Sequence, residues 1–138
     1  MKITFIANKD NSITFFKELA SNLSKKISNL VLEERFTCFI EDVPIVALES
    51  SKESDFIFVY INSDDSAESL MLKEKLIDVE LRSKTRILKV IESDTYSAAE
   101  EEDYLEFKNN LAEKYSNLIV SILFNEIEFE PKEKDFGL

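Results

Sequence analysis

The sequence predicts an α/β fold, a three-layer αβα sandwich around a parallel sheet of about four strands in the order 2-1-3-4. Short apolar runs at 2–7, 55–61 and 86–91 are rich in β-branched and aromatic residues, as buried strands are. A fourth, partly exposed strand is expected at 30–36. Segments with helical spacing of apolar residues separate these runs, and strands that alternate with helices form parallel βαβ units.

The first strand and helix occupy the N-terminal part of the chain. Residues 2–7 (KITFIA) are expected to be buried on both faces of the sheet. Asn11 or Ser12 can cap the helix that follows, because both side chains accept hydrogen bonds from free backbone N–H groups. The apolar stripe of this helix consists of Phe16, Leu19, Ala20, Leu23 and Ile27.

The centre of the sheet is expected after a second, short helix. The motif DVP at 42–44 indicates the start of that helix, with a carboxylate at the N-cap and proline in the first turn. Residues 55–61 (DFIFVYI) have the strongest strand pattern in the chain, so we expect this strand at the sheet centre. Phe5, Val59 and Ile61 should therefore be fully buried on adjacent central strands.

A third helix is expected from about Ala67, after the turn NSDDS at 62–66. The end of this helix has two interpretations. Apolar residues alternate over 77–82 as in an extended segment, but the spacing also suits a helix, and the stretch is rich in lysine and glutamate. We favour the helix.

The last strand, at 86–91 (RILKVI), leads through a loop to a long helix that begins near Glu100. The run of acidic residues from Glu100 suits the positive end of a helix dipole. Its expected core stripe is Tyr104, Phe107, Leu111, Tyr115, Leu118, Ile122 and Phe124. We expect a single domain at 1–130 and a C-terminal tail at 131–138.

The composition excludes several classes of site. The single glycine is Gly137, and glycine is what lets a backbone approach a phosphate closely, so phosphate loops and dinucleotide fingerprints are excluded. The chain has no histidine, which excludes Ser-His-Asp triads and most zinc sites. A formal net charge of −11 repels phosphate backbones, so we expect neither nucleic acid nor a membrane as a partner.

The single cysteine, Cys38, can form no intramolecular disulfide, which suits a cytoplasmic location. No apolar run is long enough to span a membrane, and we identify no signal peptide. A catalytic cysteine needs a base or a cation nearby, whereas Glu41 and Asp42 are its charged neighbours in sequence. A small buried hydrophobic side chain is the better interpretation of Cys38.

A binding site is expected outside the carboxyl ends of the strands, at the switch point between the first and third strands. The residues expected at this edge are Asn8, Lys9, Asp10, Thr37, Cys38, Phe39, Asn62, Asp64, Asp65, Glu92 and Asp94. One interpretation is a divalent-metal or phosphoryl-acceptor site as in receiver domains, with Asp10 beside Asp64 or Asp65. The better interpretation is that these residues form turns and helix caps, because a receiver also needs a fifth strand and a second acid beside the first. We expect no metal and no cofactor.

The order of elements over 2–61 resembles the archaeal riboflavin synthase family, which is related in fold to lumazine synthase. The most specific segment is 40–47 (IEDVPIVA), similar to the hydrophobic-x-Asp-hydrophobic-Pro stretch that opens the second helix of the family. Where the family carries Pro-Gly and closes its backbone around a ribityl-substituted ring, this chain has Cys38 and Phe39. The turn NSDDS replaces a glycine-containing loop, and the catalytic histidine of lumazine synthase has no counterpart.

The resemblance implies a divergent lumazine/riboflavin synthase-like protein that binds or converts a ribityllumazine- or flavin-like molecule. The ring would lie against Phe39, with hydrogen bonds from Thr37 and Asn62. The full set of expected ligand-binding residues is Asn8, Thr37, Cys38, Phe39, Asn62 and Asp64. The resemblance also implies a homo-oligomer, which eleven phenylalanines favour because interfaces are enriched in aromatic residues.

The alternative is a non-catalytic α/β protein-interaction or oligomerisation module that has kept the fold and lost the active site. The absence of histidine and of interior glycine favours this alternative. The sequence assigns no catalytic residue.

Overall fold

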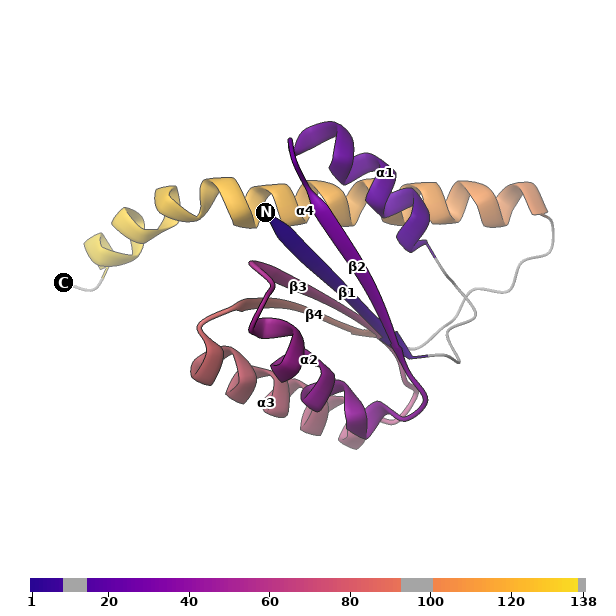
Figure 1. The fold of residues 1–138 in the computed structure, drawn as a ribbon, viewed down its shortest axis with the longest axis horizontal. Coiled ribbons are helices and arrows are strands. Elements are labelled where there is room, and N and C mark those ends of the chain that lie inside the picture. The colour runs from indigo at the N-terminus through magenta and orange to yellow at the C-terminus, as the bar shows by residue number, and fades with distance from the viewer. Residues whose placement is uncertain (9–14, 93–100, 137–138) are drawn as a thin grey trace.

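The computed structural model describes residues 1–8, 15–92 and 101–136, and it describes their side chains except at 101–102 and 125–136. The fold is the expected α/β sandwich (Figure 1). In chain order its elements are β1 (Lys2–Asn8), α1 (Phe16–Lys26), β2 (Val31–Thr37), the 3₁₀ helix η1 (Ile40–Asp42), α2 (Val43–Ser51), β3 (Phe56–Asn62), α3 (Ser66–Ser83), β4 (Arg86–Glu92) and α4 (Glu101–Phe136).

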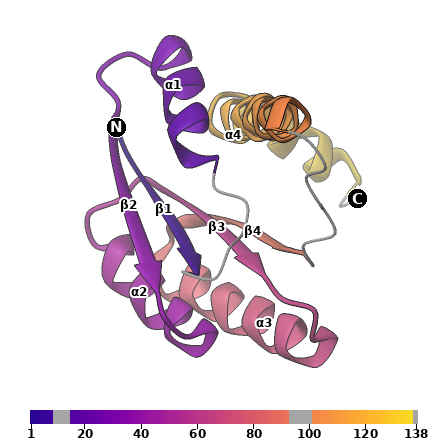
Figure 2. The same cartoon turned by 90° about the vertical axis from the view of Figure 1, so that its right-hand side faces the viewer.

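The four strands form one parallel sheet in the order β2-β1-β3-β4, which confirms the predicted order. Figure 2 shows three layers, with α1 and α4 on one face of the sheet and α2 and α3 on the other. β2 lies at an edge and is partly exposed, as its sequence predicts.

β3 is buried on both faces and lies between β1 and β4. Alternate residues of β3 enter different core clusters, and the side that faces α1 and α4 carries Phe56, Phe58 and Tyr60. The side that faces α2 and α3 carries Ile57, Val59 and Ile61. Phe5, Val59 and Ile61 are completely buried, so the prediction for the central strands is confirmed.

Aromatic rings fill the layer between the sheet and α4. The Phe58 ring lies 5.3 Å from the Tyr115 ring and 6.1 Å from the Phe5 ring, measured between centroids. The Phe15 ring stacks on that of Tyr115 at 5.8 Å. Such pairs each add about 1 kcal/mol to the stabilisation from burial. This aromatic layer joins α1, β1, β3 and α4 into one core.

The buried face of α4 differs from the predicted stripe. Tyr115 is buried as expected, and Ile119 one turn later continues its face. Leu118 and Phe124 are exposed, so the prediction that they belong to the core is wrong. Because an α-helix has 3.6 residues per turn, Phe124 lies on the opposite side of the helix from Tyr115.

Several element boundaries differ from expectation. α2 has its proline in the first turn, but Asp42 makes no side-chain capping bond because η1 precedes the helix directly. The stretch 77–82 is helical within α3, as favoured. α4 runs through the position of Pro131 to Phe136, where the sequence suggests a tail. The proposed caps Asn11 and Ser12 lie outside the described residues.

In the described ranges, two non-glycine residues adopt the left-handed region that usually favours glycine. Asn29 has φ 56° in the turn before β2, and Lys84 has φ 62° where α3 ends. At these two positions a residue with a side chain adopts the left-handed conformation that glycine would adopt freely. This conformation costs about 1 kcal/mol of stability at each position. Within the described residues, no helix is long and apolar enough to cross a membrane.

Replacing Phe58 by alanine tests the aromatic layer. Phe58→Ala is expected to lower the free energy of unfolding by about 3–5 kcal/mol, because it removes a fully buried ring and leaves a cavity. Phe124→Ala is the matched control and should cost under about 1 kcal/mol, since that ring is exposed. Urea denaturation of both variants measures the difference, and equal losses would contradict the assigned core.

Candidate functional site

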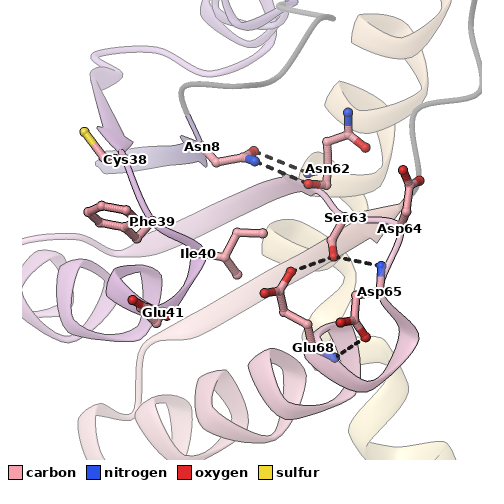
Figure 3. Close-up of a pocket in the computed structure, with 10 residues that line it drawn as sticks. All are labelled: Asn8, Cys38, Phe39, Ile40, Glu41, Asn62, Ser63, Asp64, Asp65 and Glu68. Carbon is pink, nitrogen blue, oxygen red and sulfur yellow. Dashed lines mark hydrogen bonds between the residues drawn. The ribbon is translucent and has the colours of Figure 1, made fainter.

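A pocket of about 510 Å³ lies at the carboxyl ends of β1 and β3 (Figure 3). The crevice between these strands is where open α/β sheets bind ligands. The residues that line it are Asn8, Cys38, Phe39, Ile40, Glu41, Asn62, Ser63, Asp64, Asp65 and Glu68. They come from the ends of β1 and β3, from the segment after β2, from η1 and from the first turn of α3.

Five of the six expected ligand-binding residues line this pocket, namely Asn8, Cys38, Phe39, Asn62 and Asp64. The sixth, Thr37, pairs in register with Asn8 but does not line the pocket. Thr37 is buried, and within the described part of the chain its Oγ1 has no hydrogen-bond partner.

The remaining residues expected at the edge are not brought into this pocket. Glu92 ends β4 outside it, and there the Glu92 carboxylate adds to the effect of burial in raising the pKa of Tyr115. Lys9, Asp10 and Asp94 lie outside the described residues.

Asn8 joins the ends of β1 and β3. Its Nδ2 donates to the carbonyl oxygen of Asn62 at 3.3 Å, and the Asn62 N–H donates to Asn8 Oδ1 at the same distance. The last register pair of the two strands is Ala7 with Tyr60, one residue before Asn8 and two residues before Asn62. The Asn8 amide therefore continues the β1–β3 ladder and holds the floor of the pocket, which gives this residue a structural role.

The first turn of α3 is capped by residues of the pocket wall. Asp65 Oδ1 accepts hydrogen bonds from the N–H groups of Ala67 at 2.9 Å and Glu68 at 3.1 Å. Ser63 Oγ donates to Glu68 Oε1 at 2.9 Å and accepts from the Asp65 N–H at 3.3 Å. These contacts form a capping box in which the serine hydroxyl links the glutamate to the cap. For Asp65 the structure thus supports the interpretation as a cap residue, and Glu68 contributes to the same cap through Ser63.

The pocket is acidic, and among the described side chains that line it none is basic. Glu41 and Asp64 are exposed, and neither forms an ion pair or a hydrogen bond with the described residues. Asp65 and Glu68 accept only neutral donors. No three metal-ligating side chains converge anywhere in the described ranges, and the Asp10 of the receiver interpretation falls outside them. The site is therefore suited to a positively charged or polar occupant.

Cys38 and Phe39 follow the end of the edge strand β2. Cys38 is exposed, so the prediction of a buried hydrophobic side chain is wrong. The chain leaves the sheet edge at this point, between the end of β2 and the start of η1. Phe39 is 62% exposed and lies across the pocket from Ser63 and Glu68 (Figure 3).

A second hollow adjoins the pocket. It is an apolar groove of about 350 Å³ between α2 and α3, lined by Ile40, Glu41, Pro44, Ile45, Glu68, Met71, Leu72 and Lys75. Ile40, Glu41 and Glu68 line both hollows. We call the two hollows together the α2–α3 surface.

Sequence reasoning did not identify this groove, although α2 carries a signal. Apolar residues of α2 (VPIVALESS) lie on more sides of the helix than one face of the sheet can cover. A helix that is apolar all round is usually buried all round, yet Ile45 is 59% exposed.

Replacing the cap residue tests its structural role. Asp65→Ala removes the acceptor of two backbone N–H groups and should lower the free energy of unfolding by about 1 kcal/mol. Asp64→Ala is the matched control on the neighbouring carboxylate and should change it by less than about 0.5 kcal/mol. Urea denaturation distinguishes the two residues, and an equal loss in Asp64→Ala would show that Asp64 also supports the fold.

The sequence matches no protein-family model and no curated protein. Among solved structures, it is similar to the solution structure of a phosphate-loop protein, with 20% identity, 86% of this chain and 94% of that chain covered, and a TM-score of 0.38. A similarity of this size supports no statement about function. The glycines of a phosphate loop are absent from this chain.

Proposed function

We propose that this protein is a non-catalytic interaction module that binds a segment of a partner protein on the α2–α3 surface. The observation that carries the proposal is the continuity of an apolar groove with a pocket at the carboxyl edge of the sheet, through Ile40, Glu41 and Glu68. A site of this composition is typical of helix-in-groove recognition, in which apolar side chains of a partner enter a groove.

Exposed apolar side chains support this proposal. Ile45 of α2 and Met71 of α3 both line the groove and are 59% and 53% exposed. Contiguous apolar patches on a protein surface commonly mark interaction sites, because leaving them in water is unfavourable. In the pocket, the polar side chains of Asn8, Asp65 and Glu68 are engaged in the fold, which favours binding over catalysis.

Peptide selection on the full chain tests this proposal. Peptides selected from a random displayed library should lose at least about tenfold in affinity for Ile45→Asp and Met71→Asp, because each change places a carboxylate in the groove. Leu81→Asp is the matched control, since Leu81 is 73% exposed on α3 and lies outside the groove. Selected peptides that bind the groove variants as tightly as the wild type would overturn the proposal.

A second candidate function is the binding of a ribityllumazine- or flavin-like ring in the pocket. Phe39 favours it, because its ring is largely exposed at a pocket of about 510 Å³ and does not lie in the core. The resemblance of 40–47 to riboflavin synthases supports the same ligand class. In this proposal the ring stacks on Phe39 and is held by polar groups near Asn62.

Titration with a ribityllumazine tests the second candidate. Binding should quench the ligand fluorescence, and Phe39→Ala should weaken the affinity several-fold, by about 1 kcal/mol for one lost stacking contact. Phe124→Ala, which changes an exposed ring on α4, should bind like the wild type. Unchanged ligand fluorescence with the wild type at about millimolar concentration would exclude this candidate.

We also propose a cytoplasmic location and self-association. The location is supported by Cys38, which has no second cysteine to pair with. Among the described side chains, five phenylalanines are buried within the protomer, namely Phe5, Phe15, Phe16, Phe56 and Phe58. Among the same side chains, Phe36, Phe39 and Phe124 have exposed rings that support self-association.

A further inference from the structure

We infer that the partner segment is a basic amphipathic helix whose apolar side chains enter the α2–α3 groove while a lysine or arginine reaches the carboxylates of the pocket. This inference rests on the proposed function and names the chemistry of the partner. It is carried by the shape of the groove and by the distribution of charge along it.

The groove presents a surface for a helix. Its walls are α2 and α3, and Figure 1 shows these helices side by side below the sheet. Pro44 and Ile45 line one side, and Met71 and Leu72 line the other. A third helix laid between two helices places its side chains into the groove between them. Methionine adapts to different partner shapes, since it is unbranched and polarizable.

Charge differs between the two ends of the α2–α3 surface. Four carboxylates surround the pocket end, those of Glu41, Asp64, Asp65 and Glu68, and none forms an ion pair within the described part of the chain. Of the lining side chains that the structure describes in the two hollows, Lys75 is the one that is basic, and it lies in the groove. A partner with its basic end over the pocket therefore matches this surface in charge.

The charge of the whole chain favours the same partner. A net charge of −11 attracts a basic segment from a distance and accelerates its association. A second copy of this chain carries the same net charge, so it matches the acidic pocket less well than a basic segment does. An uncharged ring ligand would use the pocket and leave the groove empty. These two occupants are the competing outcomes of the test.

The test uses two designed peptides of about four helical turns with the same leucines on one face. One carries lysines on the other face, and the other carries glutamates. Fluorescence anisotropy with the full chain should show that the lysine peptide binds at least about tenfold more tightly, and less tightly as salt rises. Circular dichroism confirms that each protein variant is folded.

Two paired charge variants locate the effect. The double variant Glu41→Gln/Asp64→Asn should weaken binding of the lysine peptide about fivefold, because it removes two unpaired carboxylates at the pocket. The control Asp103→Asn/Glu106→Gln changes two exposed acids on α4, across the sheet, and should leave the affinity as in the wild type. Equal losses in the two pairs would show a non-specific attraction and overturn the inference.

The groove variant Ile45→Asp separates this inference from the proposed function. If both peptides bind equally and both depend on Ile45, the groove is an interaction site but its partner is not basic, so only the inference fails. If neither peptide depends on Ile45, both proposals fail. Light scattering provides a further arm, because a wild-type dimer that Ile45→Asp converts to a monomer would assign the groove to a second copy and overturn the inference.

Discussion

Burial of β3 on both faces is the constraint on which the rest of the structure depends. Phe56–Ile61 present no polar face, so each side of this strand needs its own layer of helices. α1 and α4 meet its aromatic side, and α2 and α3 meet its aliphatic side. Because the crossovers change face between β1 and β3, the carboxyl ends of these two strands are left with a crevice between them. The pocket is therefore a consequence of how the core is covered.

The sheet was predictable because its signals are local. Apolar runs such as 55–61 identify buried strands, and helical spacing between the runs requires parallel strands with crossovers. The orientation of α4 about its own axis was not predictable, because apolar residues occur on most sides of this helix. Only packing against α1 and the sheet decides that Ile119 is buried and Leu118 is exposed. The exposure of Cys38 depends on where the chain leaves the edge of the sheet, which its neighbours in sequence do not indicate.

Five of the six residues expected at the site line one pocket, but sequence reasoning could not separate the polar residues there by role. Asp64 and Asp65 are adjacent and chemically identical, yet only Asp65 accepts hydrogen bonds from the first turn of α3. That difference depends on backbone direction within a single turn. The same carboxylates also create the negative field of the pocket, because a helix N-terminus stabilises negative charge without neutralising it completely. Asp65 and Glu68 therefore take part in the fold and also add negative charge to the pocket.

The wall shared by the pocket and the groove has a thermodynamic consequence. Ile40, Glu41 and Glu68 belong to both hollows, so an occupant of one that moves or neutralises these side chains changes the free energy of occupying the other. By linkage the effect is reciprocal. If a ligand in the pocket changes the affinity of the groove for its own ligand by some factor, the groove ligand changes the affinity of the pocket for its ligand by the same factor. Two occupants that both require the negative charge of Glu41 and Glu68 compete, whereas a pocket occupant that leaves these carboxylates free does not compete for them. Whether binding in one hollow strengthens or weakens binding in the other therefore depends on Ile40, Glu41 and Glu68.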